Sequence, residues 1–201
     1  SGLKKLEELE EAGFIMSFTP HYHKRQGIYY RLIDEYVLFY LKWVVPIKKS
    51  LQKKSLEKGN WQSMQQTPVW YSWLGYAFES VCYKHISAIR GALSIPPDAI
   101  ASAWRYVPRK GNLAQGAQID LLFDRNDDVI TICEIKYTEE PFVLTKGYVV
   151  ALKQKLAVFK ERTRTKKQLF LAIISANGIK NNFYAEDNIS GIVVLDDLFK
   201  Q

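Results

Sequence analysis

Two apolar runs joined by a short polar turn, AQIDLLFDRNDDVITICEIKY at residues 117–137, constrain the fold of this chain most strongly. Their alternation has the two-residue period of β-strands, and a turn at residues 125–128 predicts an antiparallel hairpin. If the turn is centred on Asp127, Asp120 lies directly opposite Glu134. Facing Cβ atoms of an antiparallel pair are about 5 Å apart, so one cation would reach both carboxylates. A register shift of one residue would move Asp120 to the other face.

The polar residues of this hairpin predict a metal-dependent reaction. Two adjacent carboxylates on a half-buried strand repel each other unless a cation lies between them. Mg²⁺ or Mn²⁺ prefers oxygen ligands, so we expect Asp120, Glu134 and the backbone carbonyl of Ile135 to bind it. Lys136 shares a face with Glu134 and would lie beside a metal-bound water. These groups suit phosphodiester hydrolysis, because the metal activates water and neutralises charge while lysine orients the nucleophile.

Asp120 followed on the next strand by EIK at residues 134–136 resembles the signature of the PD-(D/E)xK nucleases, with Ile119 where the proline would stand. The resemblance implies an α/β fold, a restriction-endonuclease-like mixed sheet flanked by helices. Its core order is helix, three strands, helix, strand. The resemblance also implies an acid on the first helix that helps to bind the metal, and Glu79 matches this position. The alternative for Glu79 is an ordinary surface glutamate.

Most of the chain resembles the C-terminal region of a class of archaeal and bacterial AAA+ type ATPases, in which a winged helix and a nuclease-like domain follow the ATPase domain. The matching stretches are LKKLEELEEAGFI, GIYYRLIDEYVLFYLKWV, GYAFESV and QIDLLFDR with ITICEIKY. This implies a partial winged helix with a linker helix at residues 1–58, and the nuclease-like domain at residues 59–201. The chain has no GxxxxGK(S/T) phosphate loop. We therefore expect a C-terminal fragment, with ATP bound only in the missing ATPase domain, which would be its partner.

The charge of the chain makes a polyanionic partner plausible. Its formal net charge is +7, and residues 153–167 carry seven lysines and arginines against Glu161 alone. Such a run lacks the usual acidic partners one helical turn away, which suits binding of a nucleic-acid backbone, DNA being the expected partner. The basic side chains expected to contact phosphates are Lys24, Arg25, Arg109, Lys110, Lys153 and Lys160. The alternative is that these turn, loop and helix charges face water.

Apolar periodicity and breaking residues locate the other elements. We expect helices at residues 3–13, 68–90 and 149–159, a hairpin at residues 14–33, and further strands at residues 100–107, 169–174 and 191–195. Asp34 is expected to cap a helix that carries an aromatic stripe at Tyr36, Phe39, Tyr40 and Trp43 and that ends at Pro46. The stripe is interpreted as core and not as a ligand site.

Cysteine usage and hydropathy favour a cytoplasmic protein that does not enter a membrane. Cys82 and Cys133 lie in apolar runs without metal-type spacing, so buried free thiols in a reducing compartment are expected. No stretch approaches the roughly 20 apolar residues of a membrane span. A homo-oligomer remains open, because nucleases of the fold that the chain resembles often need two sites to cut a duplex.

Three hypotheses follow for the central hairpin. In the first, Asp120, Glu134 and Glu79 bind Mg²⁺ and Lys136 positions the attacking water of a nuclease. In the second, the domain is a non-catalytic nucleic-acid-binding or regulatory module of the parent ATPase. In the third, Lys136 only neutralises Glu134 in a structural ion pair.

Overall fold

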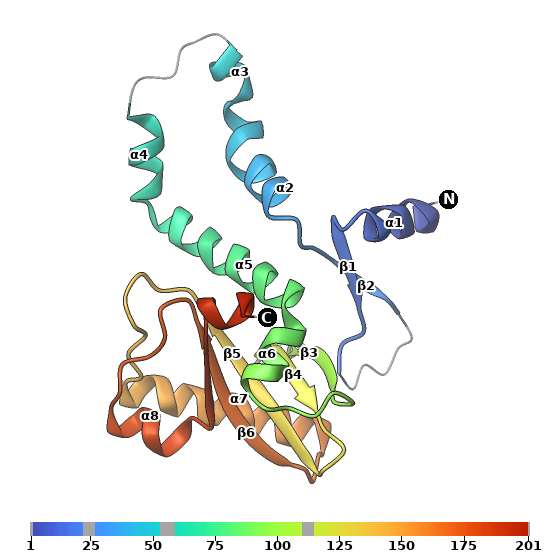
Figure 1. Cartoon of the computed structure of the whole chain (residues 1–201), viewed down its shortest axis with the longest axis vertical. Helices are drawn as coiled ribbons and strands as arrows, with labels where there is room; N and C mark the ends of the chain where they lie inside the picture. The colour runs from blue at the N-terminus through green and yellow to red at the C-terminus, as the bar shows by residue number, and fades with distance from the viewer. Residues whose placement is uncertain (1, 22–26, 53–58, 110–114, 201) are drawn as a thin grey trace. The chain divides into compact units, whose positions relative to one another are not determined.

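The computed structural model describes residues 2–21, 27–52, 59–109 and 115–200, which form two compact units (Figure 1). The first unit comprises residues 1–18 and 30–84, and the second comprises residues 19–29 and 85–201. The central hairpin belongs to the second unit. The helix that carries Glu79 belongs to the first.

The first unit begins with a helix and a hairpin. Helix α1 (Gly2–Glu11) is followed by strands β1 (Ile15–Phe18) and β2 (Tyr29–Leu32), which pair in a two-stranded sheet. Gly13 follows the helix with a φ of +76°, a left-handed conformation that glycine adopts without steric strain. The expected helix and hairpin are confirmed.

The helical path that follows does not end at Pro46, contrary to the sequence prediction. Helix α2 (Glu35–Phe39) begins at Asp34, whose carboxylate accepts a hydrogen bond from the backbone N–H of Val37 at 2.7 Å. The path continues through a π-helical turn, η1 (Tyr40–Val44), a 3₁₀ turn, η2 (Val45–Ile47), and α3 (Lys48–Gln52). Because Pro46 stands at the start of the 3₁₀ turn, where no helical N–H is needed, the change of helix type accommodates the proline.

Helices α4 (Asn60–Gln65) and α5 (Pro68–Lys84) complete the first unit. Four tryptophans and Phe39 pack together here, with ring centroids of contacting pairs 5.1–6.4 Å apart: Trp43, Trp61, Trp70 and Trp73. Trp43 is only 7% exposed. The interpretation of the aromatic stripe as core is therefore confirmed for Trp43. It is wrong for Tyr36, at the start of α2, which is 70% exposed.

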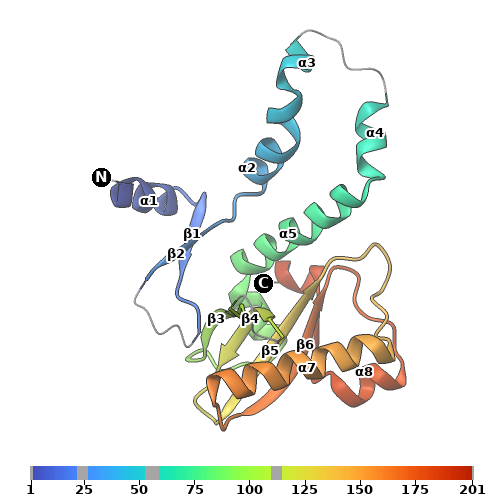
Figure 2. The same ribbon diagram turned by 180° about the vertical axis from the view of Figure 1, so that it is seen from behind.

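The second unit is built on a mixed five-stranded sheet in the order β3-β4-β5-β6-β7. Its strands are β3 (Ile100–Tyr106), β4 (Ala117–Asp124), β5 (Val129–Lys136), β6 (Gln168–Ser175) and β7 (Gly191–Val194). The first three strands pair antiparallel and the last three pair parallel. Helix α7 (Lys146–Thr163) covers one face, while α6 (Ile86–Ala92) and η3 (Leu195–Phe199) lie on the other (Figures 1 and 2). The expected α/β class with a mixed sheet flanked by helices is confirmed at this level.

The register of the central hairpin agrees with the sequence prediction. Leu121 pairs with Cys133, and Asp124 pairs with Ile130 at the turn. Continued by one residue, this register places Asp120 opposite Glu134. Because side chains alternate along a strand, both acids point to the face that α7 covers.

The core under α7 contains Trp104, Ile119, Leu122, Ile130, Ile132, Leu152, Phe159 and Leu171. Cys82 and Cys133 are both buried, as expected. The single helix expected at residues 68–90 is interrupted at His85, which separates α5 from α6. A short helix, α8 (Phe183–Asn188), was not foreseen from the sequence. No helix among the described residues is long and apolar enough to cross a membrane.

Candidate functional site

The candidate site is centred on Glu134, near the end of the central strand β5. Its neighbours along the sequence are apolar and buried, and the glutamate itself is only 4% exposed. A carboxylate at this depth is unfavourable unless charged or hydrogen-bonding partners surround it.

Three groups donate to the carboxylate of Glu134. Lys155 Nζ lies 2.5 Å from Oε2, Lys136 Nζ lies 3.0 Å from Oε1, and the hydroxyl of Tyr148 donates to Oε1 at 2.9 Å. Lys136 follows on the same strand, whereas Tyr148 and Lys155 come from α7. Both carboxylate oxygens are thus occupied by groups of the chain itself.

Asp120 lies beside this cluster on β4, where Gln118 Nε2 donates to its Oδ1 at 3.1 Å. Burial, followed by the charge of Glu134, raises the pKa of Asp120 above its usual value. Burial would also raise the pKa of Glu134, but Lys155 and Lys136 outweigh it and the pKa is lowered. At neutral pH Glu134 is therefore ionised, and Asp120 holds a proton more strongly than an exposed aspartate does.

Lys155 and Tyr148 are site residues that the sequence prediction did not identify. The signal is present in the helix: Tyr148, Leu152, Lys155 and Phe159 recur at spacings of three and four and so share one face of α7. Leu152 and Phe159 are buried against the sheet, and the same face carries the two polar groups to Glu134. Lys155 was interpreted only as one cation of a basic run, although its spacing matches that of the apolar stripe.

The cluster can be compared with what a magnesium site needs. Mg²⁺ is commonly held by one or two carboxylates and keeps several of its water ligands. Asp120 and Glu134 supply two such carboxylates. Among the described residues no group of three or more His, Cys, Asp or Glu side chains is placed to hold a metal. Because Lys155, Lys136 and Tyr148 already contact both oxygens of Glu134, binding of Mg²⁺ or Mn²⁺ by Asp120, Glu134 and the carbonyl of Ile135 stays a prediction.

Glu79 belongs to the first unit, where its carboxylate pairs with Arg31 at 3.4 Å. The guanidinium of Arg31 also lies 4.0 Å from the ring centroid of Tyr83. Glu79 thus has an ion-pair partner, Arg31, within its own unit. Its role as a metal ligand remains a prediction.

The basic residues expected to bind nucleic acid fall into two groups. Arg109, which follows β3, and Lys153 and Lys160 on α7 are exposed to solvent. Their backbone-binding role stays a prediction. Lys24, Arg25 and Lys110 lie outside the described residues.

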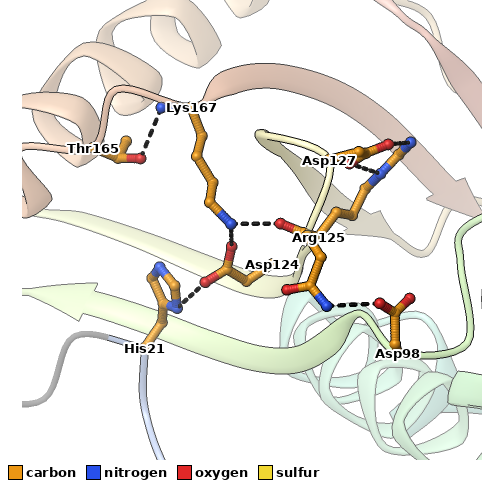
Figure 3. A network of polar contacts seen from close by, with 8 residues as sticks. His21, Asp98, Asp124, Arg125, Asp127, Thr165 and Lys167 are labelled. Carbon is orange, nitrogen blue, oxygen red and sulfur yellow. Dashed lines mark hydrogen bonds and ion pairs between the residues drawn. The ribbon is translucent and has the colours of Figure 1, made fainter.

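A second polar cluster lies at the turn end of the same hairpin (Figure 3). Asp124 stands between Lys167, whose Nζ is 2.7 Å from Oδ1, and His21, whose Nδ1 is 3.9 Å from Oδ2. The imidazole of His21 stacks on Phe159, with ring centroids 5.9 Å apart. Burial lowers the pKa of His21 and Lys167 lowers it further, against the opposing effect of Asp124.

Comparisons of the chain with models of protein families, with curated proteins and with solved structures found no match. The role of the site therefore has to follow from the chemistry of its own residues.

Proposed function

We propose that the second unit is a metal-dependent phosphodiesterase that acts on nucleic acid, with DNA as the expected substrate. The observation that carries the proposal is the register of β4 with β5, which, continued one residue past Leu121–Cys133, sets Asp120 opposite Glu134. Lys136 lies 3.0 Å from the same glutamate. Two carboxylates and a lysine converge on one end of a sheet otherwise lined with apolar side chains.

The electrostatics of the pair support this proposal. The raised pKa of Asp120 means that its surroundings do not fully stabilise the charged carboxylate. A divalent cation beside Asp120 would favour that ionised form, as Lys155 and Lys136 do in part. A purely structural ion pair between Glu134 and Lys136 has no need of a second acid at this position.

Each residue has a distinct proposed role. Asp120 and Glu134 would hold Mg²⁺ or Mn²⁺, which when bound supplies a more acidic water and neutralises phosphate charge. Lys136, whose side chain is one-third exposed, is placed to orient an attacking water. Lys155 and Tyr148 hold the carboxylate of Glu134 in position from α7, as partners of a metal ligand do.

Element order adds support for the finer fold assignment. Helices α5 and α6, strands β3 to β5, helix α7 and strand β6 follow one another in the order of the restriction-endonuclease-like core. Helix α1 with the β1–β2 hairpin supplies parts that a partial winged helix needs. We propose on this basis that the second unit has the restriction-endonuclease-like fold and that the chain is the C-terminal part of an AAA+ type ATPase.

The test is cleavage of plasmid, single-stranded and branched DNA with Mg²⁺ or with EDTA. We expect Mg²⁺-dependent cleavage by the wild-type chain and at least a hundredfold loss in Asp120→Asn and Lys136→Ala. Lys180→Ala, which removes an exposed lysine of the second unit that is not among the expected phosphate contacts, is the matched control for removal of a lysine. Wild-type rates in both site variants, with folding verified by circular dichroism, would refute the proposal.

A second function is favoured by one observation. The charge of Glu134 is already balanced by Lys136 and Lys155 without an added ion. This suits a non-catalytic nucleic-acid-binding or regulatory module that keeps the fold. Titration calorimetry with Mg²⁺ and Mn²⁺ separates the two functions. Saturable binding that Asp120→Asn abolishes supports the nuclease, and no heat of binding to either protein supports the module.

A further inference from the structure

The helical part of the first unit combines aromatic rings with positive charge. Residues 36–78 contain six lysines and a single acidic residue, Glu57. Lys42, Lys48 and Lys49 are exposed. Lys48 and Lys49 follow Lys42 by about two turns of the same helical path. These three exposed lysines favour an anionic ligand.

A surface pocket lies beside Lys42, between η1 and the beginning of α5. It has a volume of about 350 Å³ and is lined by Lys42, Pro68, Val69, Ser72, Trp73 and Tyr76. Pockets for small organic ligands begin near 300 Å³, so this one suits a single nucleotide. Its lining is mainly apolar and also includes the ammonium of Lys42 and the hydroxyls of Ser72 and Tyr76.

The two aromatic residues of the pocket differ in their surroundings. Trp73 is held by other rings of the unit, with centroids 5.1 Å from Trp70, 6.0 Å from Trp43 and 5.9 Å from Phe39. Tyr76, one turn further along α5, is 65% exposed. A fixed indole next to an accessible phenol is an arrangement on which a planar base can stack.

We propose that this pocket binds a base of single-stranded nucleic acid. Trp73 and Tyr76 contact the base, and Lys42 contacts an adjoining phosphate. Lys48 and Lys49 extend the positive surface along the path of the bound nucleic-acid strand. The site is separate from the Asp120–Glu134 cluster and does not depend on cleavage, because none of its residues belongs to that cluster.

An anionic membrane is the competing ligand for a surface that is both basic and aromatic. Membrane-binding helices present their largest apolar side chains outward as a continuous face. Here the tryptophans pack against one another, and Trp43 is nearly buried. The accessible aromatic group borders a concave pocket, which fits a flat base better than a lipid surface.

The proposal is tested by titrating the full chain with oligothymidylate in EDTA and following tryptophan fluorescence. We expect saturable quenching, because a base stacked on Trp73 quenches its emission. Tyr76→Ala should weaken binding about tenfold. Lys42→Gln should weaken it several-fold and reduce the slope of log affinity against log salt by about 0.7, the share of one phosphate contact on a single strand.

Two matched controls accompany these variants. Tyr71→Ala removes an exposed tyrosine from the same helix outside the pocket, and Lys180→Gln removes an exposed lysine from the second unit. Both should bind like the wild type. Equal affinity of Tyr76→Ala and wild type would overturn the proposal. So would sedimentation with phosphatidylserine vesicles that requires Tyr76 and Lys42 while oligothymidylate fails to bind. Because EDTA prevents metal-dependent cleavage, these outcomes are independent of the nuclease test.

Discussion

The ammonium of Lys155 on α7 lies 2.5 Å from the carboxylate of Glu134 on β5 and joins the helix to the middle of the sheet. The glutamate is nearly inaccessible to solvent, so this contact replaces hydration that the strand position removes. The same contact fixes the side chain of Glu134, a proposed metal ligand. The pair therefore bears on the stability of the unit and on its proposed metal site.

Removing Lys155 should destabilise the chain more than removing a neighbouring lysine does. In Lys155→Met the buried carboxylate keeps Lys136 and Tyr148 but loses one charged partner, so the free energy of unfolding should fall by about 2 kcal/mol. Lys153→Met, exposed on the same helix, should change it by less than about 0.5 kcal/mol. Urea denaturation at pH 7 measures both. Equal effects of the two substitutions would contradict a specific role of Lys155.

Tyr148 should make the protein sensitive to alkali. Burial and then the charge of Glu134 raise the pKa of the Tyr148 phenol far above its ordinary value of 10. The folded state therefore keeps a proton that the unfolded state releases above pH 10, and stability falls as pH rises there. One such group contributes at most about 1.4 kcal/mol per pH unit. Tyr148→Phe should lose this contribution, and it should also lower stability at pH 7 by about 1 kcal/mol through the lost hydrogen bond. Tyr71→Phe, on an exposed side chain, should match the wild type in urea titrations from pH 7 to 11.

Asp120→Asn should stabilise the metal-free protein. The folded pKa of Asp120 is raised, so the folded state binds more protons than the unfolded state once pH exceeds about 4. The stability that protonated Asp120 contributes at low pH is therefore lost as pH rises through the pKa of Asp120 in the folded state. Replacing the carboxylate by an amide removes this loss, and we expect a gain of about 1 kcal/mol at pH 7 in EDTA. Thermal unfolding from pH 4 to 8 checks the sign, because equal pH dependence in both proteins would exclude Asp120 as the cause.

His21 should destabilise the protein under mild acid. Burial and Lys167 lower its pKa, against the effect of Asp124, so the unfolded state gains a proton first as pH falls through about 6.5. The stability that is present above that pH is then lost as pH falls through the lower pKa of His21 in the folded state. His21→Gln should flatten the decline between pH 7 and 5, whereas His85→Gln serves as the control for removal of a partly buried histidine. A decline of unchanged slope in His21→Gln would assign the acid sensitivity to other groups.

The central hairpin could be predicted from the sequence to the level of single pairs. A two-residue period fixes which side chains share a face, and the short turn at residues 125–128 fixes the register that places Asp120 against Glu134. Both signals are local. The positions of β6 and of α7 followed from equally local apolar patterns.

Side-chain contacts between different helices and strands could not be predicted from such local patterns. The face of α7 that meets the sheet was visible in its apolar stripe, but Lys155 stood among other lysines and its contact with Glu134 depends on where the helix crosses β5. The continuation of the helical path beyond Pro46 depends on a π-helical turn at Tyr40–Val44, which residue preferences do not signal. The short helix α8 lacks a periodic stripe long enough to detect.

The segment Thr19–Tyr29 is separated along the chain from the rest of the sheet unit to which it belongs. Within it, the backbone N–H of His21 donates to the carbonyl of Ala103 on the edge strand β3 at 2.8 Å. The polypeptide consequently passes from one unit to the other after Phe18, Tyr29 and Lys84. Recombinant dissection at one peptide bond would leave β3 without this neighbour, so an isolated second unit requires a redesigned connection that retains His21.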